Sequence, residues 1–189
     1  MKHEKFKKII RRRAGFSLSE TLLAVLLLAI IFLAATVGVR ALYNAYQKIT
    51  VQAEAQVLLS TAVSEITNDI HGVTQVKKTP VSPTDPTAGW NYQYYTTSRN
   101  TFISYGNAAA DSSIKGITVT SGISGKTVGL LPDAANTQKL YTQIENATFD
   151  ESKNVFSCTV NILREGESKV YESTQLYIHP YSRNLIVSN

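Results

Sequence analysis

The sequence has few of the side chains that build covalent and metal-bound sites. Among its 189 residues there is one cysteine, Cys158, so no disulfide can form within the chain. The three histidines, His3, His71 and His179, lack the spacing of metal ligands. No HExxH, CxxC, phosphate-binding loop or nucleophile elbow occurs. We therefore expect no cofactor, no metal site and no enzymatic activity.

Helix-breaking residues are scarce in the first third of the chain. No proline occurs between Phe16 and His71, and Gly38 is the only glycine there. Within this stretch, residues 21–39 are almost all apolar; as a helix they would span about 28 Å, which matches the hydrocarbon core of a bilayer. The sequence predicts one helix over residues 16–71, with any kink centred on Gly38.

The part of this helix after the apolar run is predicted to be amphipathic. Apolar residues recur there mostly at steps of three and four, the period of one helix face. They are Leu42, Tyr46, Ile49, Ala53, Val57, Ala62 or Val63, Ile66 and Ile70. We expect this face to pack on a sheet formed later in the chain, with a coiled coil or stalk as the alternative. Gly72 is the expected C-cap.

The net charge of +5 originates at the start of the chain. Residues 1–15 hold seven Lys and Arg against one acid, Glu4, which leaves 12 bases and 13 acids in the remainder. Because the remainder is close to neutral, the basic pI does not predict direct binding of nucleic acid. A basic flank before an apolar helix instead predicts a cytoplasmic N-terminus, with the rest of the chain exported.

The junction between the basic flank and the apolar run carries a carboxylate. It reads Gly15-Phe16-Ser17-Leu18-Ser19-Glu20. A charge beside a membrane segment is costly and suggests a function. A cleaved secretory signal would have a shorter apolar region that ends in a small-residue cleavage site, which fits this run poorly. An uncleaved signal anchor, with Glu20 as a tolerated interfacial residue, is a further alternative.

These six residues resemble the class III signal of type IV prepilins and pseudopilins. The resemblance is specific over residues 11–39 and architectural elsewhere, and Ser19 stands where that family more often has an apolar residue. It implies that a prepilin peptidase cuts between Gly15 and Phe16 and that the new amine of Phe16 is N-methylated. It also implies that Leu18 and Glu20 serve assembly, with Glu20 pairing with the Phe16 amine of a neighbouring subunit.

The sequence pattern predicts an α+β fold, with a long N-terminal transmembrane helix followed by an antiparallel sheet. The resemblance implies that this fold is pilin-like. The expected segments are a basic leader (1–15), a transmembrane half-helix (16–39), an amphipathic half-helix (40–71) and a β-rich globular domain (72–189). The protein would cross the cell membrane once and then join a surface filament as a minor pilin or pseudopilin. Pilus, competence (with DNA uptake by the system) and type II secretion filaments remain open. Partners would be the peptidase, other subunits and membrane lipid.

The remainder of the chain shows the alternating apolar and polar residues that are typical of β-strands. In residues 154–163 one face carries Phe156, Cys158, Val160 and Ile162, and the other carries Ser157, Thr159 and Asn161. This alternation predicts a half-buried antiparallel strand and a packed thiol. Glu165-Gly166 suits a hairpin turn, and residues 79–89, with three prolines, are predicted to be a loop. Strands are also expected at 90–95, 101–105, 114–120, 126–131, 140–149 and 169–178, with an edge strand at 185–187.

Aromatic residues gather between the helix and the later strands. They are Trp90, Tyr92, Tyr94, Tyr95 and Tyr105. Two interpretations stay open: a sheet face with its cover, or a patch that binds sugars or surfaces. The second gives an alternative function, a membrane-anchored adhesin or binding module that uses the 79–113 region.

Overall fold

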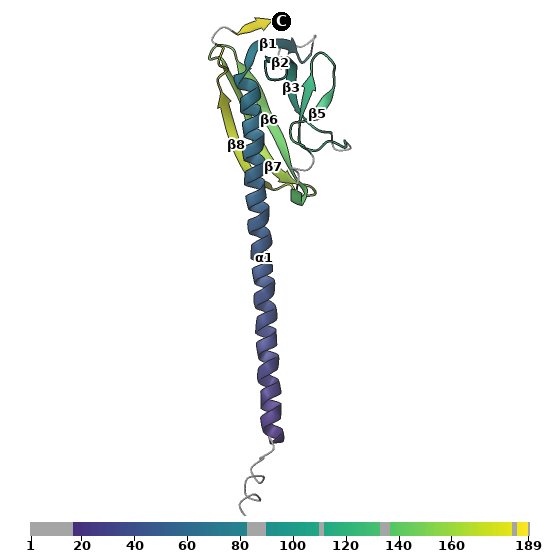
Figure 1. Ribbon diagram of the computed structural model, residues 1–189, viewed down its shortest axis with the longest axis vertical. Helices are drawn as coiled ribbons and strands as arrows, with labels where there is room; N and C mark the ends of the chain where they lie inside the picture. The colour runs from purple at the N-terminus through teal and green to yellow at the C-terminus, as the bar shows by residue number, and fades with distance from the viewer. Residues whose placement is uncertain (1–16, 83–89, 110–111, 133–136, 183–184, 189) are drawn as a thin grey trace, which may run out of the picture. The chain divides into compact units, whose positions relative to one another are not determined.

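The computed structural model shows an α+β chain with one long N-terminal helix followed by a β-rich part, as the sequence predicts (Figure 1). It describes residues 17–82, 90–109, 112–132, 137–182 and 185–188. The elements are α1 (Leu18–His71), β1 (Val73–Pro80), β2 (Trp90–Thr96), β3 (Thr101–Asn107), β4 (Ile117–Ser121), β5 (Thr127–Gly129), the 3-10 turn η3 (Thr137–Lys139), β6 (Leu140–Asp150), β7 (Val155–Arg164), β8 (Val170–Ile178) and β9 (Ile186–Ser188).

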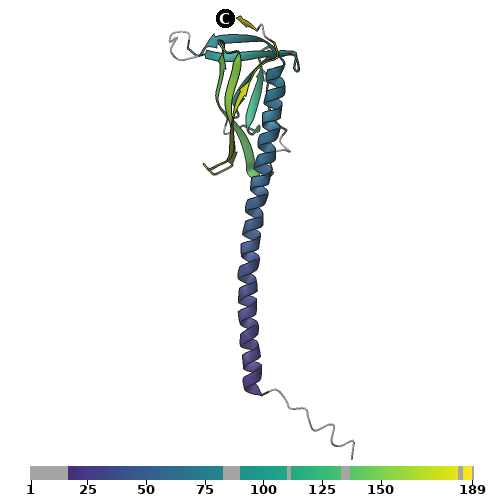
Figure 2. The ribbon, with the colours of Figure 1, turned by 90° about the vertical axis from the view of Figure 1, so that its left-hand side faces the viewer.

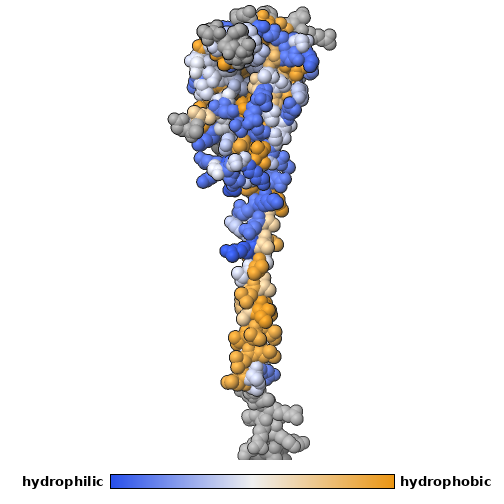
Figure 3. Space-filling model, turned by 180° about the vertical axis from the view of Figure 1, so that it is seen from behind, coloured by the Kyte–Doolittle hydropathy of each residue, from blue (hydrophilic) through white to orange (hydrophobic). Residues whose placement is uncertain are grey.

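The chain divides into two compact units, Met1–Lys48 and Ile49–Asn189. The described part of the first unit is helical from Leu18 onward, and the helix continues without a break through Gly38, so the structure shows no interruption there. Within the described residues, α1 is the one helix long and apolar enough to cross a membrane, and none of its most apolar 18-residue stretch is buried. Figure 3 shows these side chains as an almost continuous apolar surface.

The second unit contains two sheets beside the last part of α1. The larger sheet has the strand order β5-β4-β3-β2-β1-β9, and the smaller one has the order β6-β7-β8. Neighbouring strands are antiparallel except β1 and β9, which pair in parallel with Gln75 opposite Ile186. In both ribbon views the part of α1 that belongs to the second unit runs alongside the β6-β7-β8 sheet (Figures 1 and 2).

The core lies between α1 and the two sheets. Phe156, Val160 and Ile162 of β7 are fully buried in it, together with Cys158, which confirms the predicted alternation and the packed thiol. Burial raises the pKa of the Cys158 thiol to about 12, so at neutral pH this sulfur is protonated and acts as a small apolar group.

The helix face that packs on the sheets differs from the predicted one. The predicted stripe began at Leu42 and ran through Tyr46, Ile49 and Val57, but these side chains are exposed. The buried positions of the helix are Val51, Ala55, Leu58, Ala62, Ile66, Asp69 and Ile70, so only the end of the prediction is correct. The exposed set and the buried set both have helical spacing. The prediction therefore took residues from both sets as a single helix face.

Two further expectations are corrected near the end of the helix. Residues 73–80 form the strand β1, although Thr79 and Pro80 were assigned to a loop; Pro80 is its last residue, where a missing N–H costs least. Gly72 follows the helix but is not left-handed, so it is not a C-cap of that kind. A Cβ on Gly72 would lie 3.0 Å from Thr97 Oγ1, so close packing favours glycine there.

The other predicted strands are present, with shifted ends. β2, β3, β6, β7 and β8 match their predicted ranges within one or two residues, and β9 is the expected edge strand. The turn at Gly166 has the positive φ of 82° that a hairpin glycine permits. β4 begins at Ile117 rather than at Ile114, because residues 114–116 belong to the connection that lines a pocket described below.

Candidate functional site

The start of α1 is held by Ser17. Its Oγ accepts a hydrogen bond from the N–H of Glu20 at 3.3 Å, and its carbonyl oxygen accepts from the N–H groups of Glu20 and Thr21 at 3.0 and 3.1 Å. Ser17 is therefore the N-cap, and Glu20 is the third residue of the helix. A carboxylate in this first turn is favoured by the positive end of the helix dipole. Local structure alone thus gives Glu20 a stabilising position.

The structure places only part of the predicted processing and assembly site. Leu18 and Glu20 are exposed at the start of the helix. Gly15 and Phe16, the residues of the predicted cleavage and methylation, lie outside the described residues. Within the described part of the chain, Glu20 forms no ion pair.

In the second unit, α1 has two apolar faces. Each residue of an α-helix turns by about 100°, so Val51, Ala55 and Leu58 share one side, which packs on the sheets. Ile49 and Val57, with Ala53 between them, lie on the opposite side, and their side chains are 67% and 66% exposed. A helix needs only one apolar face to pack on its own sheet. The second face is therefore available for another partner.

In the sequence, Leu42 and Tyr46 precede Ile49 at the same helical spacing, and within the first unit both side chains are exposed. We call Ile49, Ala53 and Val57 of the second unit the outer stripe of α1. The sequence pattern contained this stripe but assigned it to the protein's own core. The outer stripe can be told apart from the buried set when the apolar residues on each side of the helix are grouped separately.

The aromatic residues of the 79–113 region do not form one surface. Tyr94 is 3% exposed, and its ring centroid lies 5.3 Å from that of Phe156 in the core. Tyr92 packs against Phe149, with ring centroids 6.1 Å apart. Both rings therefore contribute to packing, as the first of the two interpretations predicted.

Tyr105 also packs in that core cluster, with its ring centroid 5.9 Å from that of Phe156, whereas Tyr95 and Trp90 lie apart from it. Tyr95 contacts Phe102, at 5.3 Å between ring centroids, and its hydroxyl donates to Asn100 at 2.7 Å. Trp90 is 43% exposed, with Lys78 Nζ 5.2 Å from its ring centroid. Of the five aromatic residues predicted to form either a sheet face or a binding patch, Trp90 is the most open to solvent.

The buried carboxylate of Asp69, near the end of α1, is not predicted from the sequence. Asp69 accepts hydrogen bonds from Ser98 Oγ at 2.9 Å and from Tyr105 at 3.4 Å, and it forms an ion pair with Arg99. All three partners come from β3 or from the turn that precedes it. In sequence, an aspartate near a helix end usually indicates a solvated face, so no local signal marks it. The arrangement fastens the helix to the larger sheet.

No group of three metal-binding side chains occurs among the described residues. Comparisons with protein-family models, with curated proteins and with solved structures find no match to this chain.

Proposed function

We propose that the protein is a structural subunit, a minor pilin or pseudopilin, that assembles through α1 into a type IV pilus-like, competence or secretion filament. The resemblance of residues 15–20 to a class III signal supports cleavage after Gly15 and methylation of Phe16. The basic flank supports a cytoplasmic N-terminus. The single apolar helix, followed by a β-rich unit, is the architecture that such a subunit requires.

The observation that carries the proposal is the outer stripe of α1. A helix that served only as a membrane anchor would need apolar side chains within the bilayer, and no second apolar face where it packs on its own sheet. Ile49, Ala53 and Val57 form such a face on the side away from the core. Exposed apolar patches of this kind mark association sites. The helix of a neighbouring subunit is the occupant that fits a narrow stripe with helical spacing.

The physical mechanism follows from the helix. Before assembly, the apolar run stays in the bilayer, because its side chains lack any other apolar surroundings. Assembly brings the outer stripes of several subunits together and removes their side chains from water. Glu20 then pairs with the Phe16 amine of a neighbour. In a poor dielectric this pair fixes the register of one helix against the next.

The outer stripe is tested by placing a charge on it. Val57→Lys should leave the protein folded, because Val57 faces away from the core, and should lower its incorporation into filaments about tenfold or more. Gln52→Lys is the matched control, on the same helix and exposed but off the stripe. The readout is the ratio of protein in sheared filaments to protein in membranes, measured by quantitative immunoblot. Equal incorporation of both variants would refute the role of the stripe.

Processing is tested by intact mass and by the N-terminal residue of protein taken from its native membrane. A chain that begins at Phe16, with or without an added methyl group, supports the proposal. A chain that still begins at Met1 contradicts it and favours the uncleaved signal anchor. Gly15→Asp should block removal of the leader, and normal processing of this variant would also count against the proposal.

A further inference from the structure

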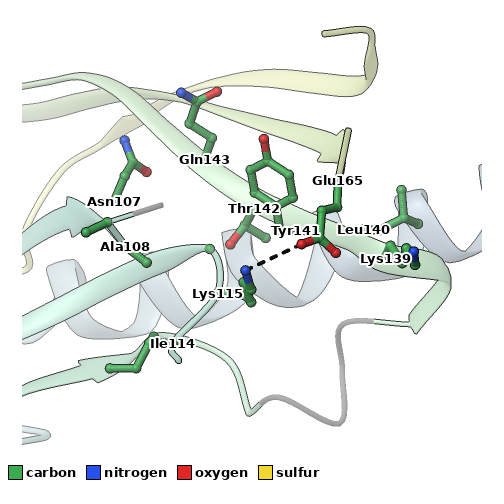
Figure 4. A pocket seen from close by; sticks show the side chains of 12 residues that line it. Asn107, Ala108, Ile114, Lys115, Lys139, Leu140, Tyr141, Thr142, Gln143 and Glu165 are labelled. Atoms are coloured by element: carbon green, nitrogen blue, oxygen red, sulfur yellow. Dashed lines mark ion pairs between the residues drawn. The ribbon is translucent and has the colours of Figure 1, made fainter. Parts of the chain in front are cut away.

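A pocket of about 490 Å³ lies in the second unit, where the connection between β3 and β4 faces the start of β6 (Figure 4). The turn after β7 closes one side through Glu165. Apolar side chains, Ile114 and Leu140 among them, line part of the wall. The volume is within the range of pockets that hold small organic molecules. None of the outer-stripe residues and none of the five aromatic residues of the 79–113 region line this pocket.

The wall of the pocket is fixed by hydrogen bonds. The side-chain amide of Asn107 accepts from the N–H of Ile144 and donates to its carbonyl oxygen, both at 2.8 Å. The hydroxyl oxygen of Thr142, a buried residue, accepts from the N–H of Ile117 at 3.0 Å. Gly116 has a φ of 85°, and a Cβ there would lie 2.6 Å from Thr142 Oγ1. These hydrogen bonds join the two sheets at the pocket.

One rim of the pocket has an uncommon backbone. Gln138 and Lys139 have φ angles of 52° and 59°, a left-handed conformation that side chains other than glycine rarely adopt. Hydrogen bonds hold them there, from Arg164 Nε to Gln138 O at 3.2 Å and from the N–H of Glu165 to Lys139 O at 2.9 Å. Such backbone conformations concentrate at binding sites. Here they place a lysine and a glutamate side by side at the rim.

The rim carries more positive than negative charge. Lys115 Nζ lies 3.6 Å from Glu165 Oε1, and the two side chains are 47% and 58% exposed, so this ion pair is weak and exchangeable. Lys139 forms no ion pair within the described residues. An anion entering the pocket would meet Lys139 and compete with Glu165 for Lys115.

The part of β6 that lines the pocket offers groups that suit a polar ring. Tyr141 and Gln143 are alternate residues of β6, so their side chains project from the same face of the strand, as Figure 4 shows. A tyrosine ring packs against the C–H face of a sugar, and an amide both donates to and accepts from hydroxyl groups. Both side chains are half-buried.

We propose that this pocket binds a sugar unit that carries a carboxylate, such as a hexuronic acid. The carboxylate lies at Lys115 and Lys139, and the sugar ring lies against Tyr141 with its hydroxyl groups at Gln143. An inorganic anion would leave the tyrosine and the amide unused, and a neutral sugar would leave the lysines unused. The proposal concerns the second unit alone and does not depend on assembly into a filament.

The test uses the full chain in lipid nanodiscs and D-glucuronate as the probe, with D-glucose and acetate as its neutral and ringless counterparts. Binding is followed by saturation-transfer NMR at low salt. We expect saturable binding of glucuronate at millimolar concentration, with at least tenfold weaker binding of glucose and of acetate. Lys115→Gln should weaken glucuronate binding threefold or more, and Lys126→Gln, a change of the same charge away from the pocket, should not.

Removal of a negative charge from the pocket tests whether the charged residues bind the probe or have only a structural role. Glu165→Gln frees Lys115 and removes a competing carboxylate, so it should tighten glucuronate binding severalfold. Glu65→Gln changes the net charge equally but lies on α1, outside the pocket lining, and should leave the affinity unchanged. Absence of saturable glucuronate binding, equal binding of glucose or acetate, or equal effects of the two glutamate variants would each overturn the proposal.

Discussion

Arg99 and Asp69 form an ion pair that joins the turn after β2 to the last turn of α1. Arg99 Nε lies 2.9 Å from one carboxylate oxygen of Asp69 and 3.1 Å from the other. The Asp69 side chain is 3% exposed, whereas that of Arg99 is 32% exposed. A carboxylate near a helix C-terminus opposes the helix dipole, and its burial adds a desolvation cost. The ion pair offsets both costs.

Removal of the arginine should therefore destabilise the fold more than neutralisation of the aspartate. Arg99→Met leaves the Asp69 carboxylate buried with only hydroxyl donors, and we expect a loss of about 1–3 kcal/mol, lower than for a fully buried pair because Arg99 is partly exposed. Asp69→Asn should cost less, and Arg99→Met in that background should cost little further. Urea unfolding of the full chain in detergent measures all four members of this cycle. Equal losses from Arg99→Met in both backgrounds would show that the charges are not coupled.

This ion pair also shows where sequence reasoning stops. The long helix and the strands β6 to β8 could be predicted, because helical spacing and alternation are local signals. Asp69 and Arg99 are 30 residues apart in sequence, and neither has a neighbour that marks it as buried. Which apolar face of α1 meets the sheets is likewise decided by strands that follow later in the chain. The strand β1 was missed because its apolar residues Val73 and Val76 are three apart rather than two.

The stability of the second unit should fall steeply at alkaline pH. Burial raises the pKa of Tyr94 above its usual value of 10.0, and burial together with the Asp69 charge raises that of Tyr105. Above pH 10 the unfolded chain loses these protons while the folded chain keeps them. The stabilisation is therefore complete below pH 10 and declines as the pH rises further.

Tyr94→Phe tests this pH dependence with little change in packing, because phenylalanine keeps the ring contact with Phe156. Between about pH 10 and 11.5, the free energy of unfolding of the variant should fall less steeply than that of the parent, by up to about 1.4 kcal/mol per pH unit. Below pH 9 the difference between the two proteins should be constant. Parallel curves over the whole range would show that the hydroxyl of Tyr94 is not held protonated by the fold.

Gly116 should tolerate a methyl group far less well than Gly125. Both have positive φ, 85° and 64°, so alanine is conformationally strained at either position. At Gly125 no heavy atom lies within 4 Å of the added Cβ, whereas at Gly116 the Cβ would meet Thr142 Oγ1 at 2.6 Å. We expect Gly125→Ala to cost about 1 kcal/mol and Gly116→Ala about 2–4 kcal/mol, measured by urea unfolding. Similar losses of unfolding free energy in the two variants would mean that the connection between β3 and β4 shifts readily to accommodate the methyl group.

Glu20 can be tested for two roles that a single substitution separates. Its position three residues after the N-cap Ser17 stabilises the helix start, whereas the proposed function needs its charge. Glutamine at this position can still hydrogen-bond at the helix start and loses only the charge, whose interaction with the helix dipole is worth about 0.3–1 kcal/mol. Alanine removes both properties.

We expect Glu20→Gln to be cleaved after Gly15 like the parent protein but to enter filaments about tenfold less, because the Phe16 amine of the neighbouring subunit would be left unpaired in a poor dielectric. Intact mass reports cleavage, and the ratio of filament to membrane protein reports assembly. Ser17→Ala, which weakens the N-cap and keeps the charge, is the control and should assemble nearly normally. If Glu20→Gln assembles normally and Ser17→Ala does not, the function of Glu20 is to start the helix, and the subunits are held in register by the outer stripe alone.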